Sequence, residues 1–161
     1  MNIEIITGDL TNPAHAQALT RLLSEYATDP MGGSKALPDE VLQALPQRLS
    51  ARADYLFVLA KDESGFVGLT NCFEGFSTFK AQPLLNIHDV VVSTHARGRG
   101  VARLMLQRVE TIARERGCCK LTLEVLEGNR VAQNSYRAVG FNGYELDPAM
   151  GRAMFWEKPL T

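Results

Sequence analysis

The chain of 161 residues has the size of one compact domain and is too short for two full-sized ones. Apolar residues make up 45% and charged residues 22% of the sequence, which is enough apolar material for a core. The formal net charge is -1, so the protein does not have the strongly positive field of a nucleic-acid binder. We therefore predict one domain, residues 1–161, with no nucleic-acid partner.

The cysteines and the N-terminal sequence indicate the cellular compartment in which the protein is expected. Cys72, Cys118 and Cys119 are odd in number, and two of them are adjacent, so they make a poor disulfide framework. No C-x-x-C pair is present, which argues against a structural zinc site, and we predict no metal. No basic region precedes the first apolar residues, and no apolar run approaches the roughly 20 residues that span a bilayer. We expect a cytoplasmic protein without a membrane partner.

Apolar periodicity predicts the elements in chain order. A β-branched strand comes first, and a helix follows the start signal Asn12-Pro13. After a Gly/Pro-rich loop and a second helix, three strands run consecutively; Val90-Val91-Val92 ends the third. A helix, a strand, a short helix and a C-terminal two-stranded hairpin complete the chain. The predicted ranges are 3–7 (β), 13–26 (α), 38–52 (α), 55–60 (β), 66–79 (β), 84–92 (β), 99–116 (α), 121–126 (β), 129–139 (α) and 141–159 (hairpin).

These elements predict an α/β (α+β) fold in the order β-α-α-β-β-β-α-β-α-β-β. Consecutive strands favour antiparallel pairing, whereas the strand–helix–strand unit at 84–126 favours a parallel crossover. We therefore expect a mixed central sheet of about seven strands with helices on both faces.

A Gly/Arg-rich turn between a strand and a helix carries the strongest chemical signal. Small residues let backbone N–H groups approach a ligand, and a helix N-terminus adds free donors and partial positive charge. Arg97 and Arg99 add charge-assisted donors, so the turn suits a pyrophosphate. A Walker loop is excluded because no Gly-Lys-Ser/Thr ending follows, and a Rossmann fingerprint is excluded because Arg103 stands at the third glycine position.

Two ordered blocks resemble the GNAT superfamily of N-acetyltransferases. The first is Arg97-x-x-Gly100-x-Ala102 after a strand ending in Val92, and the second is Asn129-x-x-Ala132-x-x-x-Tyr136-x-x-x-Gly140-Phe141. The stretch from Ser77 to Val92 is similar, less specifically, to the polyamine (diamine) acetyltransferase-like branch. The resemblance implies the GNAT fold, acetyl-CoA as co-substrate and transfer of an acetyl group to a primary amine. A homodimer is typical of the resembled family.

The resemblance also implies where acetyl-CoA would bind. The pantetheine arm would pair with the backbone of the strand that ends in three valines, where two neighbouring strands splay apart. The pyrophosphate would lie on the turn that follows, and Asn129 would contact the cofactor at the start of a later helix. The implied cofactor-binding residues are Val90, Val91, Val92, Arg97, Gly98, Arg99, Gly100, Val101, Ala102 and Asn129.

Acid and base candidates follow from the chemistry of amine attack on a thioester, which requires a proton acceptor for the amine and a donor for the thiolate. Tyr136 matches the resembled family's general acid. His88 and Asp89 are candidates for the base: an imidazole has a suitable pKa, and strand alternation puts only one of the two in the cleft unless the strand is bulged. A water chain ending on Glu74 or Glu124 is an alternative.

The acceptor site is expected at the first helices and the loop between them. Tyr26, Asp29 and Met31 are the substrate candidates, with Gly32 beside them, and the carboxylates of Glu25 and Asp29 would attract a cationic amine. A cluster of phenylalanines suits an apolar pocket, the core or a dimer interface: Phe73, Phe76 and Phe79. We expect a small-molecule amine acceptor. A protein or peptide acceptor, and a non-catalytic acyl-CoA-binding sensor, are the alternatives.

Overall fold

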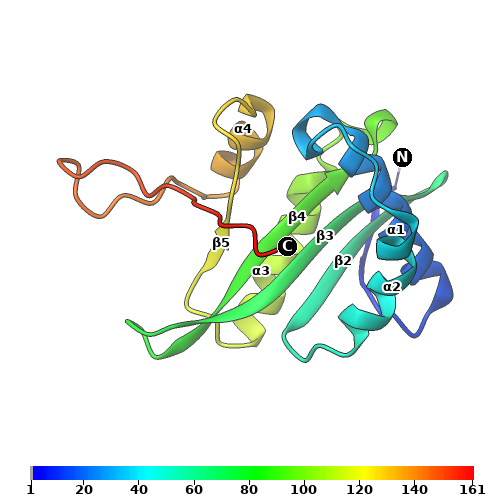
Figure 1. Ribbon diagram of the computed structural model, residues 1–161, viewed down its shortest axis with the longest axis horizontal. Helices are drawn as coiled ribbons and strands as arrows, with labels where there is room; N and C mark the ends of the chain where they lie inside the picture. Colours follow the sequence, from blue (N-terminus) through cyan, green and yellow to red (C-terminus); the bar gives the residue numbers. More distant parts are fainter. Residues whose placement is uncertain (1) are drawn as a thin grey trace.

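A computed structural model describes residues 2–161 of the chain (Figure 1). Within these residues five strands form one sheet: β1 (Glu4–Thr7), β2 (Tyr55–Asp62), β3 (Gly65–Ser77), β4 (Gln82–Val92) and β5 (Leu121–Leu123). The α-helices are α1 (Pro13–Thr28), α2 (Asp39–Ser50), α3 (Val101–Glu115) and α4 (Arg130–Ala138). Two short 3-10 turns, η1 (Pro30–Gly32) and η2 (Thr94–Ala96), follow α1 and β4.

The sheet has the strand order β1-β2-β3-β4-β5. Neighbouring strands are antiparallel except β4 and β5, which are parallel because α3 carries the chain from one to the other. The expected mixed sheet is confirmed. The expected strand count is wrong, since the described residues form five strands and the element order ends at α4.

The two strands predicted in 141–159 do not form. The expected turn is present: Glu145 and Arg152 make an isolated antiparallel bridge, and the amide of Ala153 donates to the carbonyl of Tyr144 at 3.2 Å. The segments on either side of the turn pair with no strand of the sheet, and residues 142–161 are all exposed. A strand needs a partner edge for its backbone groups, so the apolar composition of this segment alone does not make it one. In Figure 1 the orange part of this segment loops out beyond α4 and β5, and its red C-terminal part runs back over β5 in this view.

Two apolar cores lie on opposite faces of the sheet, which confirms helices on both faces (Figure 1). On one face α3 buries Val101, Met105 and Val109 at helical spacing. On the other face α1 buries Leu19 and Leu22 beside α2. The helices thus cover both faces of the sheet, which leaves its ends and edges for a site.

The helix ends follow the local sequence. Asn12 caps α1, its side chain accepting from the amide of Ala14 at 3.0 Å, and Pro13 occupies the first turn, where no amide donor is needed. Pro46 lies within α2 and does not divide it. No helix among residues 2–161 is long and apolar enough to cross a bilayer.

Candidate active site

The strands β4 and β5 diverge at the centre of the candidate site. Their parallel pairing covers only Leu85–Ile87 of β4, which face Leu121–Leu123 of β5. β4 continues to Val92, and its other edge pairs with β3 through Val90, Val91 and Val92. The edge of β4 that faces β5 is thus open beside the three valines. An extended chain with amide groups can add to such an edge as a strand does.

The turn after β4 leads into the N-terminus of α3. Gly98 and Gly100 have φ angles of 76° and 78°, in the left-handed region that favours glycine. Gly100 is the N-cap and offers no side chain, so the first amides of α3, at Val101, Ala102 and Arg103, have no partner within the helix. Donors at a positive helix end are suited to phosphate oxygens.

Two arginines of this turn are held by carboxylates. Arg97 Nη2 donates to Asp29 Oδ2 at 2.8 Å, and its Nε donates to the carbonyl of Val92 at 3.1 Å. Arg99 Nη1 donates to Asp62 Oδ2 at 2.9 Å. The Asp62 carboxylate is 3% exposed, whereas the Arg97 guanidinium is half-exposed. Arg97 can therefore turn toward a ligand more easily than Arg99 can.

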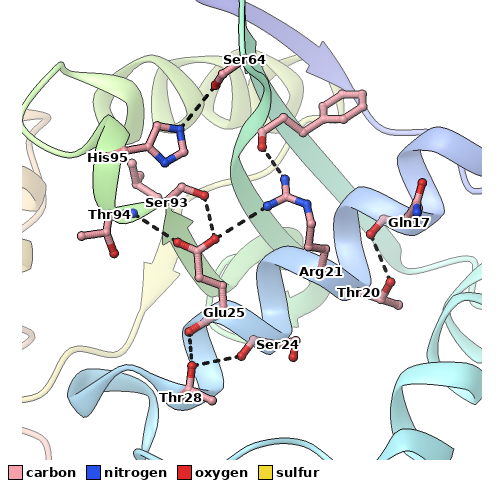
Figure 2. A network of polar contacts seen from close by, with 12 residues as sticks. Gln17, Thr20, Arg21, Ser24, Glu25, Thr28, Ser64, Ser93, Thr94 and His95 are labelled. Carbon is pink, nitrogen blue, oxygen red and sulfur yellow. Dashed lines mark hydrogen bonds and ion pairs between the residues drawn. The ribbon is translucent and has the colours of Figure 1, made fainter.

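Glu25 ties α1 to the same turn (Figure 2). Its Oε2 accepts from Ser93 Oγ at 2.8 Å and its Oε1 from the amide of Thr94 at 3.2 Å, while Arg21 lies 3.7 Å away. These partners satisfy the carboxylate. Glu25 is thus a structural link between α1 and the turn, not a free charge for an amine.

A β-bulge interrupts β4 beside the divergence. Asn71 of β3 faces Asp89, but the next residue, Cys72, faces Ile87, so His88 is an extra residue in β4. The bulge changes the alternation of side chains along the strand. His88 and Asp89 can therefore lie on the same face of the sheet. Regular alternation along a strand would have put them on opposite faces.

The contacts of both residues place them on the α1/α2 face of the sheet. The His88 ring meets the Phe73 ring edge to face, with centroids 5.4 Å apart. Asp89 Oδ2 accepts from Asn71 Nδ2 at 2.9 Å. Asn71 and Phe73 are two residues apart on β3 and share its face. His88 is exposed and Asp89 is half-buried.

Two tyrosines, Tyr55 and Tyr26, lie within electrostatic range of Asp89. Tyr55 Oη donates to Asn71 Oδ1 at 2.8 Å, which completes a chain from Tyr55 through Asn71 to the carboxylate. Burial raises the pKa of Tyr55, and the charge of Asp89 adds to the rise. Burial also raises the pKa of Tyr26, with Asp89 and Asp29 as further causes. Neither Tyr55 nor Asn71 was predicted as a site residue from the sequence. The available signal was a polar asparagine within the apolar run that forms β3.

Tyr136 reaches the same region from α4. Its ring packs on the α3 core beside Phe141, at a centroid distance of 6.1 Å. Burial raises the pKa of Tyr136 to about 12, and Tyr26 adds to the rise, so the two phenols lie within electrostatic range. Tyr136 is protonated at neutral pH and can donate. Asn129 caps α4, its Oδ1 accepting from the amide of Ala132 at 3.1 Å.

The remaining acceptor candidates, Asp29, Met31 and Gly32, lie on the loop after α1. Asp29 accepts from the amide of Met31 at 2.9 Å and is neutralised by Arg97, so only movement of that arginine frees its carboxylate. The carbonyl of Met31 accepts from Tyr26 Oη at 3.3 Å, while the Met31 side chain is exposed. Gly32 lies against the backbone of Tyr26, which leaves no room for a side chain.

Other predicted residues lie elsewhere. Phe76, 62% exposed, lies near the end of β3, and Phe79, 97% exposed, lies in the turn that follows. Of the three phenylalanines, Phe73 is the one packed on the α1/α2 face of the sheet. Glu74 pairs with Arg116 after α3, at 3.3 Å. Glu124 is exposed, just after β5. All three cysteines are free thiols.

Comparison with known proteins identifies the family. A family model described as the acetyltransferase (GNAT) family matches residues 16–141, most of the chain. The chain therefore belongs to the GNAT family, and it is an N-acetyltransferase. The resemblance drawn from the two sequence blocks is confirmed.

Individual relatives agree with this family. The uncharacterized N-acetyltransferase YhfO of Bacillus subtilis (strain 168) is 29% identical over 109 residues, 66% of this chain and 71% of the relative. The streptothricin acetyltransferase of Streptomyces lavendulae is 39% identical over 66 residues, 41% of this chain but only 35% of the relative. The structure of AAC(6')-Iy with the bisubstrate analogue CoA-S-monomethyl-acetylneamine has a TM-score of 0.78 at 17% identity, covering 99% of both chains. At that identity the last match shows the fold alone.

Proposed function

We propose that this chain transfers the acetyl group of acetyl-CoA to a primary amine of a small, cationic molecule. The observation that carries the proposal is Asp89, a half-buried carboxylate beside the divergence of β4 and β5. None of the ion pairs within residues 2–161 involves Asp89, whereas Arg97 neutralises Asp29, and Ser93 and Thr94 satisfy Glu25. A carboxylate without a cation, lined by tyrosines, suits an ammonium group.

The open edge of β4 supports the expected mode of cofactor binding. The amides of a pantetheine arm would pair with the backbone of Val90–Val92, and the pyrophosphate would lie on Gly98–Ala102 at the N-terminus of α3. Arg97 is half-exposed and would turn from Asp29 to the phosphates. Because the Asn129 side chain caps α4, this residue would contact the cofactor only through its backbone.

The arrangement of side chains supports direct attack on the thioester. Asp89 would hold the ammonium, and His88, exposed on the same face, would accept one of its protons and pass it to solvent. The free amine would form the new C–N bond at the thioester carbon and then lose its second proton. As the C–S bond breaks, Tyr136 would give its proton to the sulfur and take up the second proton of the amine. The net products are then an amide, free CoA and the one proton that His88 passed to solvent.

The relatives support a small-molecule acceptor. One is named for streptothricin, and one solved structure holds an analogue that joins CoA to acetylneamine. Because the streptothricin match spans 35% of that relative, its substrate is carried to this chain as a proposal only.

The test measures release of CoA thiol with a panel of polyamines, aminoglycosides, amino acids and lysine peptides. We expect turnover with small cationic amines. Turnover of peptides alone would overturn the small-molecule acceptor, and CoA binding without thiol release from any acceptor would identify a sensor.

Three variants test the roles. Asp89→Asn should raise KM for the amine and leave CoA affinity unchanged. Tyr136→Phe should lower kcat by about 10²-fold or more, the usual loss for a general acid, again without loss of CoA affinity. His88→Ala should remove the acidic limb of the pH–rate profile; an unaltered limb would exclude His88 as the base.

A further inference from the structure

Tyr55 occupies a central place on the face of the sheet that carries His88 and Asp89. It is the first residue of β2, and its partner in the register is Phe73 of β3. Its ring stacks on Phe57 with centroids 5.6 Å apart, and it lies 5.3 Å from the Phe73 ring. Packing against two rings holds the tyrosine in one rotamer, so the position of its phenol oxygen is fixed as well.

The hydroxyl of Tyr55 determines which end of the Asn71 amide faces Asp89. Tyr55 Oη donates to Asn71 Oδ1 at 2.8 Å, and Asn71 Nδ2 donates to Asp89 Oδ2 at 2.9 Å. The two ends of a carboxamide have the same shape but opposite hydrogen-bonding character. Burial raises the pKa of Tyr55, so the phenol stays neutral and needs an acceptor for its proton. Because Oδ1 is that acceptor, the N–H of the buried amide is left for the carboxylate.

The ring of Tyr55 supports the other residue of the pair. The Phe73 ring meets His88 edge to face, with centroids 5.4 Å apart. Phe73 is held in turn by Tyr55 and by Arg52, whose guanidinium lies 5.4 Å from the centroid of the Phe73 ring. Two hydrogen bonds to Asp54, at 3.0 Å and 2.7 Å, fix that guanidinium. The exposed imidazole of His88 therefore rests on a ring that other groups keep in place.

We propose that Tyr55 is a positioning residue for the acetyl transfer. Through the Asn71 amide its hydroxyl orients Asp89, and through Phe73 its ring orients His88. This inference rests on the proposed function, because it uses the roles given there to Asp89 and His88. His88 is an extra residue in β4, so the regular ladder does not by itself fix the directions of these two side chains. Tyr55 supplies that constraint from two strands away, without contact with the reacting atoms.

The variant Tyr55→Phe separates the hydroxyl from the ring. It keeps the ring contacts but removes the O–H, so the Asn71 amide can turn its oxygen toward Asp89. We expect KM to rise about threefold to tenfold for the amine of the thiol-release panel that turns over fastest, the equivalent of one hydrogen bond. The value of kcat and the affinity for CoA should not change. Tyr144→Phe is the matched control, because Tyr144 is 64% exposed and lies after α4; all constants should stay as in the native chain.

The variant Tyr55→Leu removes the ring together with the hydroxyl. We expect kcat to fall about tenfold in addition to the rise in KM, because the imidazole that accepts the proton loses its support. Tyr55→Phe is the conservative variant that should restore kcat. If Tyr55→Leu does not fold, Phe73→Leu tests the ring contact directly, and it should lower kcat with little change in KM. An unchanged kcat in the folded variants would overturn the role of the ring.

A double-mutant cycle tests whether the hydroxyl acts through Asn71. Asn71→Leu removes both ends of the amide, and in that background Tyr55→Phe should leave KM unchanged, because no amide remains to be oriented. The second change should also raise the urea midpoint of the Asn71→Leu variant, since it removes a buried hydroxyl that has lost its acceptor. Effects on KM that add in the double variant would overturn the proposal. A rise in KM for Asp89→Asn with none for Tyr55→Phe would overturn it as well and leave the proposed function standing, whereas no thiol release with any amine would remove both.

Discussion

The contact between Arg97 and Asp29 predicts that acetyl-CoA competes with a carboxylate of the acceptor loop. Arg97 donates at once to Asp29 and to the carbonyl of Val92, which lies at the end of the open edge. Cofactor binding that recruits Arg97 must break the pair with Asp29. The change to test is Asp29→Asn, because the amide oxygen can still accept from the amide of Met31 while the charge is lost.

The expected change in CoA affinity on Asp29→Asn is a small increase. The arginine side chain is 49% exposed and the carboxylate 18%, so solvent screens the pair, and such pairs contribute about 1 kcal/mol or less. Asp29→Asn should therefore tighten CoA binding by up to about fivefold. Arg97→Ala should weaken it by about 10- to 100-fold, through loss of a charge-assisted hydrogen bond of about 1.5–3 kcal/mol.

Calorimetric titration with CoA measures both effects. Asp54→Asn is a matched control, because Asp54 forms a similarly exposed pair with Arg52, at 2.7 Å, away from the cofactor turn. It should leave affinity unchanged. If Asp29→Asn weakens CoA binding, the pair is not broken by the cofactor and the reasoning fails.

Three further predictions concern single positions. Gly100→Glu should abolish CoA binding in the same titration, whereas Gly100→Ala, which shares the strain of a φ of 78° without the charge, should bind more weakly but measurably. Gly32→Ala should lower the free energy of unfolding in urea by about 1–3 kcal/mol, because the added carbon meets the Tyr26 carbonyl; an unchanged midpoint would contradict this. Hydrogen bonds from Ser64, and then Arg99, lower the pKa of Asp62, so its stabilisation is present above the ordinary carboxyl pKa of about 4 and lost as the pH falls below it. Asp62→Asn should therefore destabilise the chain in urea at pH 7 by more than at pH 3, and an equal loss at both would refute the assignment.

Local patterns predicted the elements up to α4 because each carries its own periodic signal. Leu19 and Leu22 in α1, or Val101, Met105 and Val109 in α3, share a face at helical spacing, and they bury that face as predicted. Residues 144–161 also carry several large apolar side chains. Whether they become strands depends on a neighbouring edge, which no local pattern specifies.

The bulge at His88 could not be predicted from the local sequence either. It depends on the register of β4 against β3, where Asn71 faces Asp89 and Cys72 faces Ile87. A shift of one residue reverses the faces of all following side chains, so the bulge determines whether the imidazole lies with the carboxylate.

The carboxylates of the acceptor region show why residue types alone did not identify the amine site. Glu25, Asp29 and Asp89 are equivalent in the sequence as attractors of a cation. In the fold, Glu25 is satisfied by the turn after β4, and Asp29 by an arginine 68 positions away. Among residues 2–161, the side-chain hydrogen bond that the Asp89 carboxylate accepts comes from the neutral amide of Asn71. A neutral donor orients the carboxylate and leaves its charge uncompensated, so the ammonium of an acceptor supplies the counter-charge. The same reasoning makes Asn71 a positioning residue. Asn71→Asp would put a second negative charge beside Asp89, and we expect it to disturb amine binding while CoA binding stays intact.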